Sequence, residues 1–201
     1  LLSIIGIARE AAAVLLQYGI DAEFIPLKLN FQETNNSKFP IEIINDPKLV
    51  NRICAVVMEV EIKNSPEFIK ERLETSDIRS LNNVIDVTNY ITRLIGHPAH
   101  VFDFDRLNTN KLFIKEAKKG EKITTLDGKN YVLNGDEIVA VDQNQRIVDL
   151  LGIMGLENSV VTEKTKKIML FIDNNEPHHI RNASMGLGIR TEAAAINEKG
   201  V

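Results

Sequence analysis

The side chains with the most chemical potential in this sequence are amides, carboxylates and imidazoles between positions 80 and 105. Asn82, Asp86 and Asn89 are separated by four and then three residues, which places them on one face of a helix. Asparagine and aspartate are unfavourable inside helices because their short side chains compete for backbone hydrogen bonds. Three of them on one face therefore indicate specific hydrogen bonding. His97 and His100 follow directly after this helix.

The four histidines do not have the spacing of a metal site. His97 and His100 are three positions apart across a proline, and His178 and His179 are adjacent. The chain also lacks the patterns of a zinc-binding helix, a nucleophile elbow, a phosphate-binding loop and a dinucleotide-binding loop. We therefore expect no metal ion, no cofactor in this domain and no nucleophilic side chain of certain identity. The polar groups are more suited to binding and orienting a ligand.

One helix and the bend that follows it must position these groups. Ser80 is the predicted N-cap, because its hydroxyl can accept from the free amides of the first turn. Gly96 predicts a left-handed cap at the other end, and Pro98 cannot continue the helix. The apolar residues on the opposite face recur at spacings of three and four and predict a buried stripe: Val84, Val87, Ile91 and Leu94.

Six short motifs occur in a recognisable order along the chain. They are residues 6–10 (GIARE), 82–90 (NNVIDVTNY), 96–103 (GHPAHVFD), 152–155 (GIMG), 190–193 (RTEA) and 198–201 (EKGV). In this order they resemble the B3/B4 region of the bacterial phenylalanyl-tRNA synthetase beta subunit. The resemblance covers nearly the whole chain, with a weak patch between about positions 17 and 50. It implies that residues 1–201 are a single B3/B4-type editing domain cut from a longer beta chain.

The resemblance implies a pocket that hydrolyses tyrosine wrongly attached to the phenylalanine tRNA. Asn89 and His100 match positions that line this pocket, and Gly155 matches the first glycine of a Gly-Gly pair where bare backbone approaches the ester. Thr191 and Ala193 match the far wall. The implied mechanism uses polar groups and backbone to position a water and to stabilise the oxyanion. His100 either helps to orient that water or is a satisfied histidine at a helix exit.

Two pocket positions depart from the family pattern. The family usually reads Leu-Glu-Ser-Ala before the last helix, and its glutamate receives the tyrosine hydroxyl, whereas this chain has Phe171 at that place. A hydroxyl buried there without a partner costs roughly 1 to 3 kcal/mol. Leu156 replaces the second glycine of the pair and adds a branched side chain where backbone must come close. Glu157 and Glu192 are nearby carboxylates that could substitute, although their spacing gives no reason to prefer this.

We therefore predict an editing fold with weak or absent editing activity. An active deacylase with a rearranged pocket and a free-standing ligand-binding protein of the same fold remain as alternatives, so whether this domain alone is an enzyme stays open. The resemblance also implies a parent phenylalanine-tRNA ligase, an aminoacyl-tRNA synthetase of protein biosynthesis. Its implied partners are an alpha subunit and the tRNA acceptor end, and ATP and magnesium would bind elsewhere in the parent.

Composition limits the other possibilities. The 201 residues include 44% hydrophobic residues and carry a formal charge of −4, so the chain has no general attraction to phosphate. Any RNA binding must come from local patches. The single cysteine, Cys54, excludes an internal disulfide and fits a reducing compartment, so we expect a cytoplasmic location. No apolar run approaches the roughly 20 residues of a membrane helix.

The predicted fold class is α+β, with a barrel-like mixed β-sheet core flanked by helices. The patterns predict helices at 3–19, 65–73, 80–96 and 177–187. They predict strands at 41–44, 55–62, 111–117, 122–126, 130–133, 137–141, 147–152 and 168–173. Asp127-Gly128 and Asn134-Gly135 predict tight turns, so we expect an antiparallel meander from 111 to 152.

Overall fold

The computed structural model describes residues 2–29 and 39–200 and has the predicted α+β class. The helices are α1 (Ile4–Leu15), α2 (Glu67–Thr75), α3 (Asn83–Ile95), α4 (Phe104–Leu107), α5 (Pro177–Leu187) and α6 (Glu192–Asn197), with 3-10 turns η1 (Leu16–Tyr18) and η2 (Glu157–Ser159). The strands are β1 (Glu42–Ile44), β2 (Val50–Glu59), β3 (His100–Asp103), β4 (Lys111–Glu116), β5 (Lys122–Thr124), β6 (Asn130–Val132), β7 (Ile138–Val141), β8 (Ile147–Leu150), β9 (Met154–Gly155) and β10 (Lys167–Asn175).

The strands form three sheets. A five-stranded sheet has the order β1-β4-β7-β8-β9, a three-stranded sheet has the order β2-β10-β3, and β5 pairs with β6. The pair β1 and β4 is parallel and the other pairs are antiparallel. Within residues 2–29 and 39–200 these sheets do not close into a barrel. The expected meander is also interrupted, because β4 pairs with β7 and the intervening β5–β6 hairpin forms its own sheet.

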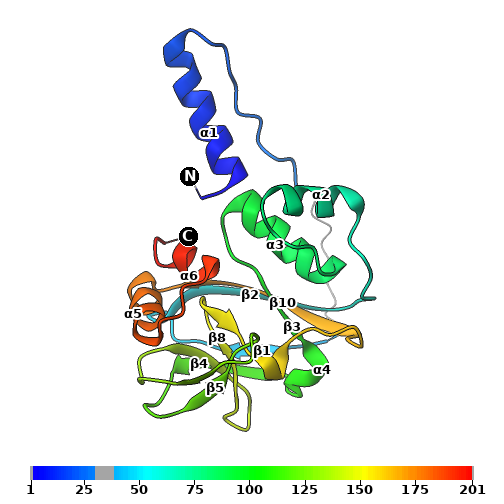
Figure 1. Ribbon diagram of the computed structural model, residues 1–201. Coiled ribbons are helices and arrows are strands. Elements are labelled where there is room, and N and C mark those ends of the chain that lie inside the picture. Colours follow the sequence, from blue (N-terminus) through cyan, green and yellow to red (C-terminus); the bar gives the residue numbers. More distant parts are fainter. Residues whose placement is uncertain (1, 30–38, 201) are drawn as a thin grey trace.

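One apolar core joins the two larger sheets. Strand β7 is buried at all four positions, and β10 alternates buried and half-buried residues along most of its length. The most completely buried members of this core include Phe102, Leu112, Val139, Val148 and Met169. Helices α2 and α3 lie to one side of the sheets, and α5 and α6 lie beside one end of them (Figure 1).

Helix α3 begins two residues later than predicted. Its N-cap is Asn82, whose Oδ1 accepts from the backbone amides of Val84 at 3.1 Å and Ile85 at 3.0 Å. The Ser80 hydroxyl donates instead to the fully buried Asp86 at 2.5 Å. Asp86 also accepts hydrogen bonds from the Ser65 hydroxyl and from the Leu81 amide. Its carboxylate therefore pairs with three donors that precede the helix. On the polar face of α3, Asn82 and Asp86 therefore have a structural role, because they fix the start of the helix and the loop before it.

The opposite face of α3 is less buried than its pattern predicts. Val84 is buried, whereas Val87 is 40% exposed. The predicted cap at the end of the helix is confirmed, since Gly96 has a φ of 77° and its amide donates to the Thr92 carbonyl. A residue with a β-carbon is strained at such an angle. The chain therefore turns sharply at Gly96 toward β3.

Helix α1 projects away from the sheets (Figure 1). It begins after the predicted Ser3 cap, whose Oγ accepts from the Gly6 amide at 2.9 Å, and the following turn ends at Gly19. The apolar residues of this helix do not form a buried face, because none of them is buried and Ile4 and Ile7 are more than half exposed. Among the helices that the structure describes, none is long and apolar enough to cross a membrane.

Candidate functional site

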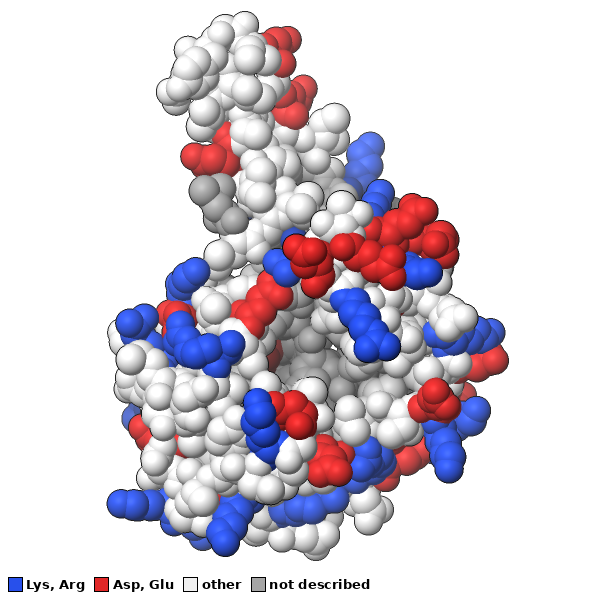
Figure 2. Space-filling view, in the orientation of Figure 1, with Lys and Arg blue, Asp and Glu red and all other residues white. Residues whose placement is uncertain are grey.

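A cavity of about 310 Å³ opens between α3, β3, the β8–β9 turn and the start of α6. Its size is at the lower end of the range of small-ligand sites. Most of its wall is apolar and comes from Ile85, Pro98, Ala99, Val101, Leu126, Leu150, Ile153, Met154, Val160 and Val161. Figure 2 shows a recess on this face of the molecule, with uncharged atoms over most of its wall. The apolar walls favour a ligand with an apolar body.

Six of the seven predicted pocket residues line this cavity. They are Asn89, His100, Gly155, Leu156, Thr191 and Ala193. These residues come from α3, β3, the β9 region and the start of α6, which are far apart in the sequence. No described residue makes a hydrogen bond to the Asn89 side chain, so its amide is available to a ligand. The sequence motifs therefore mark one place in the fold.

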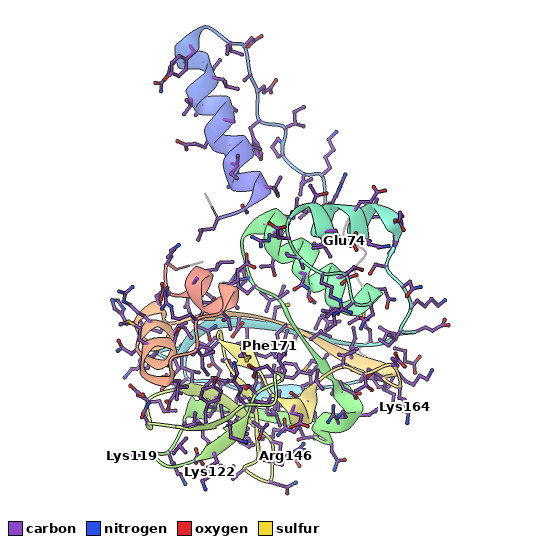
Figure 3. All side chains as sticks on the ribbon, viewed as in Figure 1. Glu74, Lys119, Lys122, Arg146, Lys164 and Phe171 are labelled. Atoms are coloured by element: carbon purple, nitrogen blue, oxygen red, sulfur yellow. The ribbon has the colours of Figure 1, made fainter. Side chains whose placement is uncertain are left out.

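Phe171 is the predicted residue that the cavity does not include. Its side chain is 1% exposed and belongs to the main core, and Figure 3 shows it in the interior of the domain. Its ring meets Phe102 edge-on, with the ring centroids 5.7 Å apart. Phe102 in turn stacks on His100 at a centroid distance of 4.2 Å. Phe171 thus supports His100 from behind, through Phe102.

His100 is held in the cavity by a carboxylate. Its Nδ1 lies 3.1 Å from Asp149 Oδ2, so Nδ1 carries the hydrogen when the ring is neutral and Nε2 is the free acceptor. Burial by itself lowers the pKa of His100. The charge of Asp149, its hydrogen bond and the charge of Asp173 outweigh burial, and the net result is a raised pKa. The ring is thus a base of more than ordinary strength.

Gly155 allows His100 to occupy this place. A β-carbon at Gly155 would lie 3.0 Å from both Cε1 and Nε2 of His100, which is closer than ordinary contact distance. The close approach that the structure shows is therefore between the Gly155 backbone and the imidazole of His100. Leu156, the next residue, is 2% exposed and its side chain is part of the core at the cavity wall.

Two carboxylates at the cavity were not predicted from the sequence. Asp149 is 2% exposed and its Oδ1 has no hydrogen-bond partner among the described residues. Asp173 is 7% exposed, and its Oδ2 accepts from Asn175 Nδ2 at 2.8 Å. Burial and the charge of Asp149 raise the pKa of Asp173 to about 6. The hydrogen bond from Asn175 acts in the opposite direction and is the weaker effect. The sequence did contain a signal for these carboxylates, because Asp149 and Asp173 are single aspartates within two otherwise apolar predicted strands.

The carboxylates proposed from the sequence lie elsewhere. Glu157 is exposed in η2, and Glu192 makes an ion pair with Arg93 at 2.7 Å. Neither lines the cavity. Across the ranges 2–29 and 39–200, no group of three or more His, Cys, Asp and Glu side chains has an arrangement that could hold a metal ion.

Polar residues near the chain end fix the turn between β8 and β9. The Thr191 hydroxyl donates to the Ile153 carbonyl at 2.6 Å and accepts from the Ala194 amide, so it caps α6 and anchors the turn. Asn197 Nδ2 donates to the Gly152 carbonyl at 3.1 Å. These bonds hold one wall of the cavity in place.

Gly152 should be the most sensitive glycine of this turn. Its φ is 67°, and an added β-carbon would lie 2.7 Å from Asn175 Nδ2 and 2.8 Å from Ile180 Cδ1. Gly188 has the same φ but open space around it, so Gly188→Ala reports the backbone strain alone. We expect Gly152→Ala to lower the free energy of unfolding by at least about 1 kcal/mol more than Gly188→Ala, as measured by urea denaturation. Equal losses would show that the turn yields easily.

Comparison with known proteins identifies relatives of this domain. The model of the family described as "B3/4 domain" matches residues 50–201. The phenylalanine–tRNA ligase beta subunit of Clostridium tetani is 38% identical over 201 residues, which are 98% of this chain and 25% of that protein. The beta subunit of Thermotoga maritima is 38% identical over 205 residues, with 100% of this chain and 25% of that protein covered. This chain therefore spans about a quarter of the length of these relatives.

A solved structure has a similar fold. It is the crystal structure of an N-terminal fragment of the phenylalanyl-tRNA synthetase beta subunit from Pyrococcus horikoshii. The two superimpose with a TM-score of 0.50 at 14% sequence identity, over 87% of this chain and 52% of that one. At this identity the likeness concerns the fold.

Proposed function

Since the chain belongs to the B3/4 domain family, we propose that it works as a domain of a phenylalanine–tRNA ligase beta subunit. The parent protein would attach phenylalanine to its tRNA in the cytoplasm, with an alpha subunit as its partner. ATP and magnesium would be bound in other parts of that assembly. The domain described here would receive the aminoacyl end of the tRNA.

The observation that carries this proposal is the assembly of the cavity. Asn89, His100, Gly155 and Thr191 are separated by up to about a hundred positions in the sequence, yet they line one space of about 310 Å³. A cavity with apolar walls and a few convergent polar groups is the usual form of a small-ligand site. We infer that the amino acid of an aminoacyl ester enters this cavity and that its ester lies near His100.

The residues of the cavity can support ester hydrolysis without a covalent intermediate. A water held by His100 Nε2 would attack the ester carbonyl and give its proton to the imidazole, while the Asp149 carboxylate stabilises the imidazolium. Backbone and the Asn89 amide would stabilise the oxyanion. When the intermediate collapses, the carbon–oxygen bond to the ribose breaks and the imidazole returns the proton to that oxygen. The products are a free amino acid and an uncharged tRNA.

Selectivity for tyrosine is expected to be weak or absent. The position that carries the tyrosine-binding glutamate in the resembled family holds Phe171, which is buried in the core. Leu156 adds a side chain at the cavity wall where the family has a glycine. A pocket that hydrolysed both esters would waste correctly charged tRNA, so we propose that hydrolysis is slow overall.

A second candidate is an active deacylase with a rearranged pocket. The pairing of His100 with Asp149 favours it, because an imidazole with a fixed tautomer and a raised pKa is suited to general base catalysis. The two candidates differ in the rate of ester hydrolysis and in the preference between tyrosyl and phenylalanyl esters. Both use the same pocket.

Hydrolysis of two substrates separates these candidates. Tyrosyl-tRNA and phenylalanyl-tRNA, both with the phenylalanine acceptor, are incubated with the full ligase that contains this domain, with and without His100→Ala. Hydrolysis no faster than in buffer supports a retained scaffold. Hydrolysis that depends on His100 supports the rearranged deacylase. Faster removal of tyrosine than of phenylalanine would contradict the proposed loss of selectivity.

The pH dependence of any hydrolysis should report His100. The base must be neutral to accept a proton, and its pKa is raised, so the rate should increase with pH through a midpoint above 6.5. Asp149→Asn removes the charge that raises this pKa and should move the midpoint to lower pH, while the rate at the plateau falls. An unchanged midpoint would show that another group is the base. The Asp136→Asn variant, at an exposed position, is the control.

A further inference from the structure

The buried polar atoms that lack partners at the cavity are acceptors. Asp149 Oδ1 and Asn197 Oδ1 have no hydrogen-bond partner among the described residues, and both side chains line the cavity at 2% exposure. The bond from Asn197 Nδ2 to the Gly152 carbonyl fixes which end of that amide is the oxygen. Buried acceptors without donors are costly, so a ligand that fills this place should be a donor.

The charges at the same end of the cavity are negative. Asp149 and Asp173 both line it, and they are close enough that the charge of Asp149 acts on Asp173. Among the described residues that line the cavity there is no lysine and no arginine. His100 pairs with one oxygen of Asp149, and His97 Nε2 meets only the backbone carbonyl of Asp173 at 2.9 Å. The two carboxylates therefore have less positive charge around them than a buried pair requires.

We propose that this end of the cavity is a subsite for a primary ammonium group on a ligand with an apolar body, and that the Asp149 carboxylate is its main charged partner. An ammonium group has three donors, and the side chains of Asp149, Asp173 and Asn197 supply oxygen acceptors at this end of the cavity. The apolar walls formed by residues such as Ile85, Met154 and Val161 would hold the rest of the ligand.

This subsite deepens the proposed function, on which it rests only for the source of the ligand. An aminoacyl ester carries one α-ammonium group next to the ester, so it belongs to the ligand class that the acceptors select. Free amines of similar shape belong to the same class and contain no ester. Their binding can therefore be measured whether or not the domain hydrolyses anything.

Binding of a cation should be linked to pH. The titratable groups that face the subsite are His97, His100, Asp149 and Asp173. With a pKa of about 6, Asp173 is partly protonated in weakly acidic solution, and His100 is then positively charged. A bound ammonium group favours the ionised carboxylate and the neutral imidazole. Both effects have the same sign, so affinity should increase as the pH rises from 5 to 7.5.

The test compares three probes of similar size by calorimetric titration of the full protein at pH 7.5. Phenethylamine is a cation at this pH, 2-phenylethanol has the same shape without the charge, and 4-ethylphenol offers a neutral phenol donor. We expect phenethylamine to bind at least 10-fold more tightly than either neutral probe. It should also release protons on binding at pH 5.5 to 6.

Variants then place the ammonium group. Asp149→Asn should weaken phenethylamine binding by about 10- to 100-fold, the range for loss of a charged hydrogen bond, and should change the binding of 2-phenylethanol by much less. Asp136→Asn, at an exposed site, should change neither. Thermal unfolding of each variant shows whether it is folded.

Two results would overturn the inference. One is equal affinity for phenethylamine and 4-ethylphenol, which would show that the subsite binds hydrogen-bond donors without requiring a positive charge. The other is a folded Asp149→Asn variant that binds phenethylamine as the unmodified protein does, which would place the cation elsewhere. Neither result depends on hydrolysis of tRNA esters, so failure of the subsite and failure of the proposed function remain distinguishable.

Discussion

Phe171→Glu is expected to unfold much of the protein instead of restoring a tyrosine-binding carboxylate. The side chain is 1% exposed and its ring packs edge-on against Phe102. Removing a buried phenylalanine ring costs about 3 to 5 kcal/mol, and a buried carboxylate without a partner adds several more. Native domains are stable by only about 5 to 15 kcal/mol. Urea denaturation monitored by circular dichroism should show loss of most of the free energy of unfolding.

Two variants test the reason for this effect. Phe171→Leu keeps an apolar side chain and should cost clearly less than Phe171→Glu. Val56→Glu places the same carboxylate on the neighbouring strand β2 at a site that is 50% exposed, and it should have a small effect. If Phe171→Glu instead stays within about 1 kcal/mol of the unmodified protein, the new carboxylate reaches water. Combining it with Leu156→Gly would then be a fair reconstruction of the family pocket.

The place of Phe171 changes how selectivity should be sought. Phe171 and Asp173 are two positions apart on β10, so their side chains leave the strand on the same face. Phe171 pairs with His100 in the register of β10 and β3, whereas Asp173 lies beyond the last paired residue of β3. Strand β10 therefore places the Phe171 ring in the core and, two residues later, the Asp173 carboxylate at the cavity. The carboxylate that this strand contributes to the cavity is Asp173, with Asp149 beside it.

The local structure was largely predictable from the sequence. Helix α5 has its predicted bounds of 177–187, and the strands from β4 to β8 lie within two or three residues of their predicted ranges. These elements depend on signals that are close in the chain, such as caps, turns and alternation. Strand β3 was not predicted, because His100 to Asp103 are four residues that become a strand only by pairing with β10. Helix α6 was also not predicted, because its six residues are too few to show a clear helical pattern of apolar residues.

The site was predictable only in part, for the same physical reason. Motifs identified Asn89 and His100, but no spacing relates His100 to Asp149, which is 49 positions away on another sheet. The cap of α3 was misplaced because Ser80 could bond either the helix amides or Asp86, and a buried carboxylate is the stronger attraction. Long-range pairing of this kind must be seen in three dimensions.

Asp173→Asn is expected to stabilise the protein at neutral pH. A carboxyl whose pKa rises from 3.8 in the unfolded chain to about 6 in the native state favours folding when protonated. That contribution is complete below pH 3.8 and is lost as the pH increases through 6. At 1.36 kcal/mol for each unit of pKa, it amounts to up to about 3 kcal/mol. The amide oxygen of the variant can still accept the hydrogen bond from Asn175 Nδ2, so little else is lost.

The pH dependence of this gain is what identifies its cause. The free energy of unfolding, measured by urea denaturation at pH 4.5 and 7.5, should favour Asp173→Asn clearly more at pH 7.5, with Asp136→Asn as the exposed control. The charges that face Asp173 are those of Asp149, His100 and His97, and Asp149 alone is negative among them. A gain that is equal at the two pH values would mean that Asp173 is ionised in the native state throughout. In that case the cavity holds two full negative charges before any ligand arrives, and the attraction for an ammonium group would be present even in weak acid.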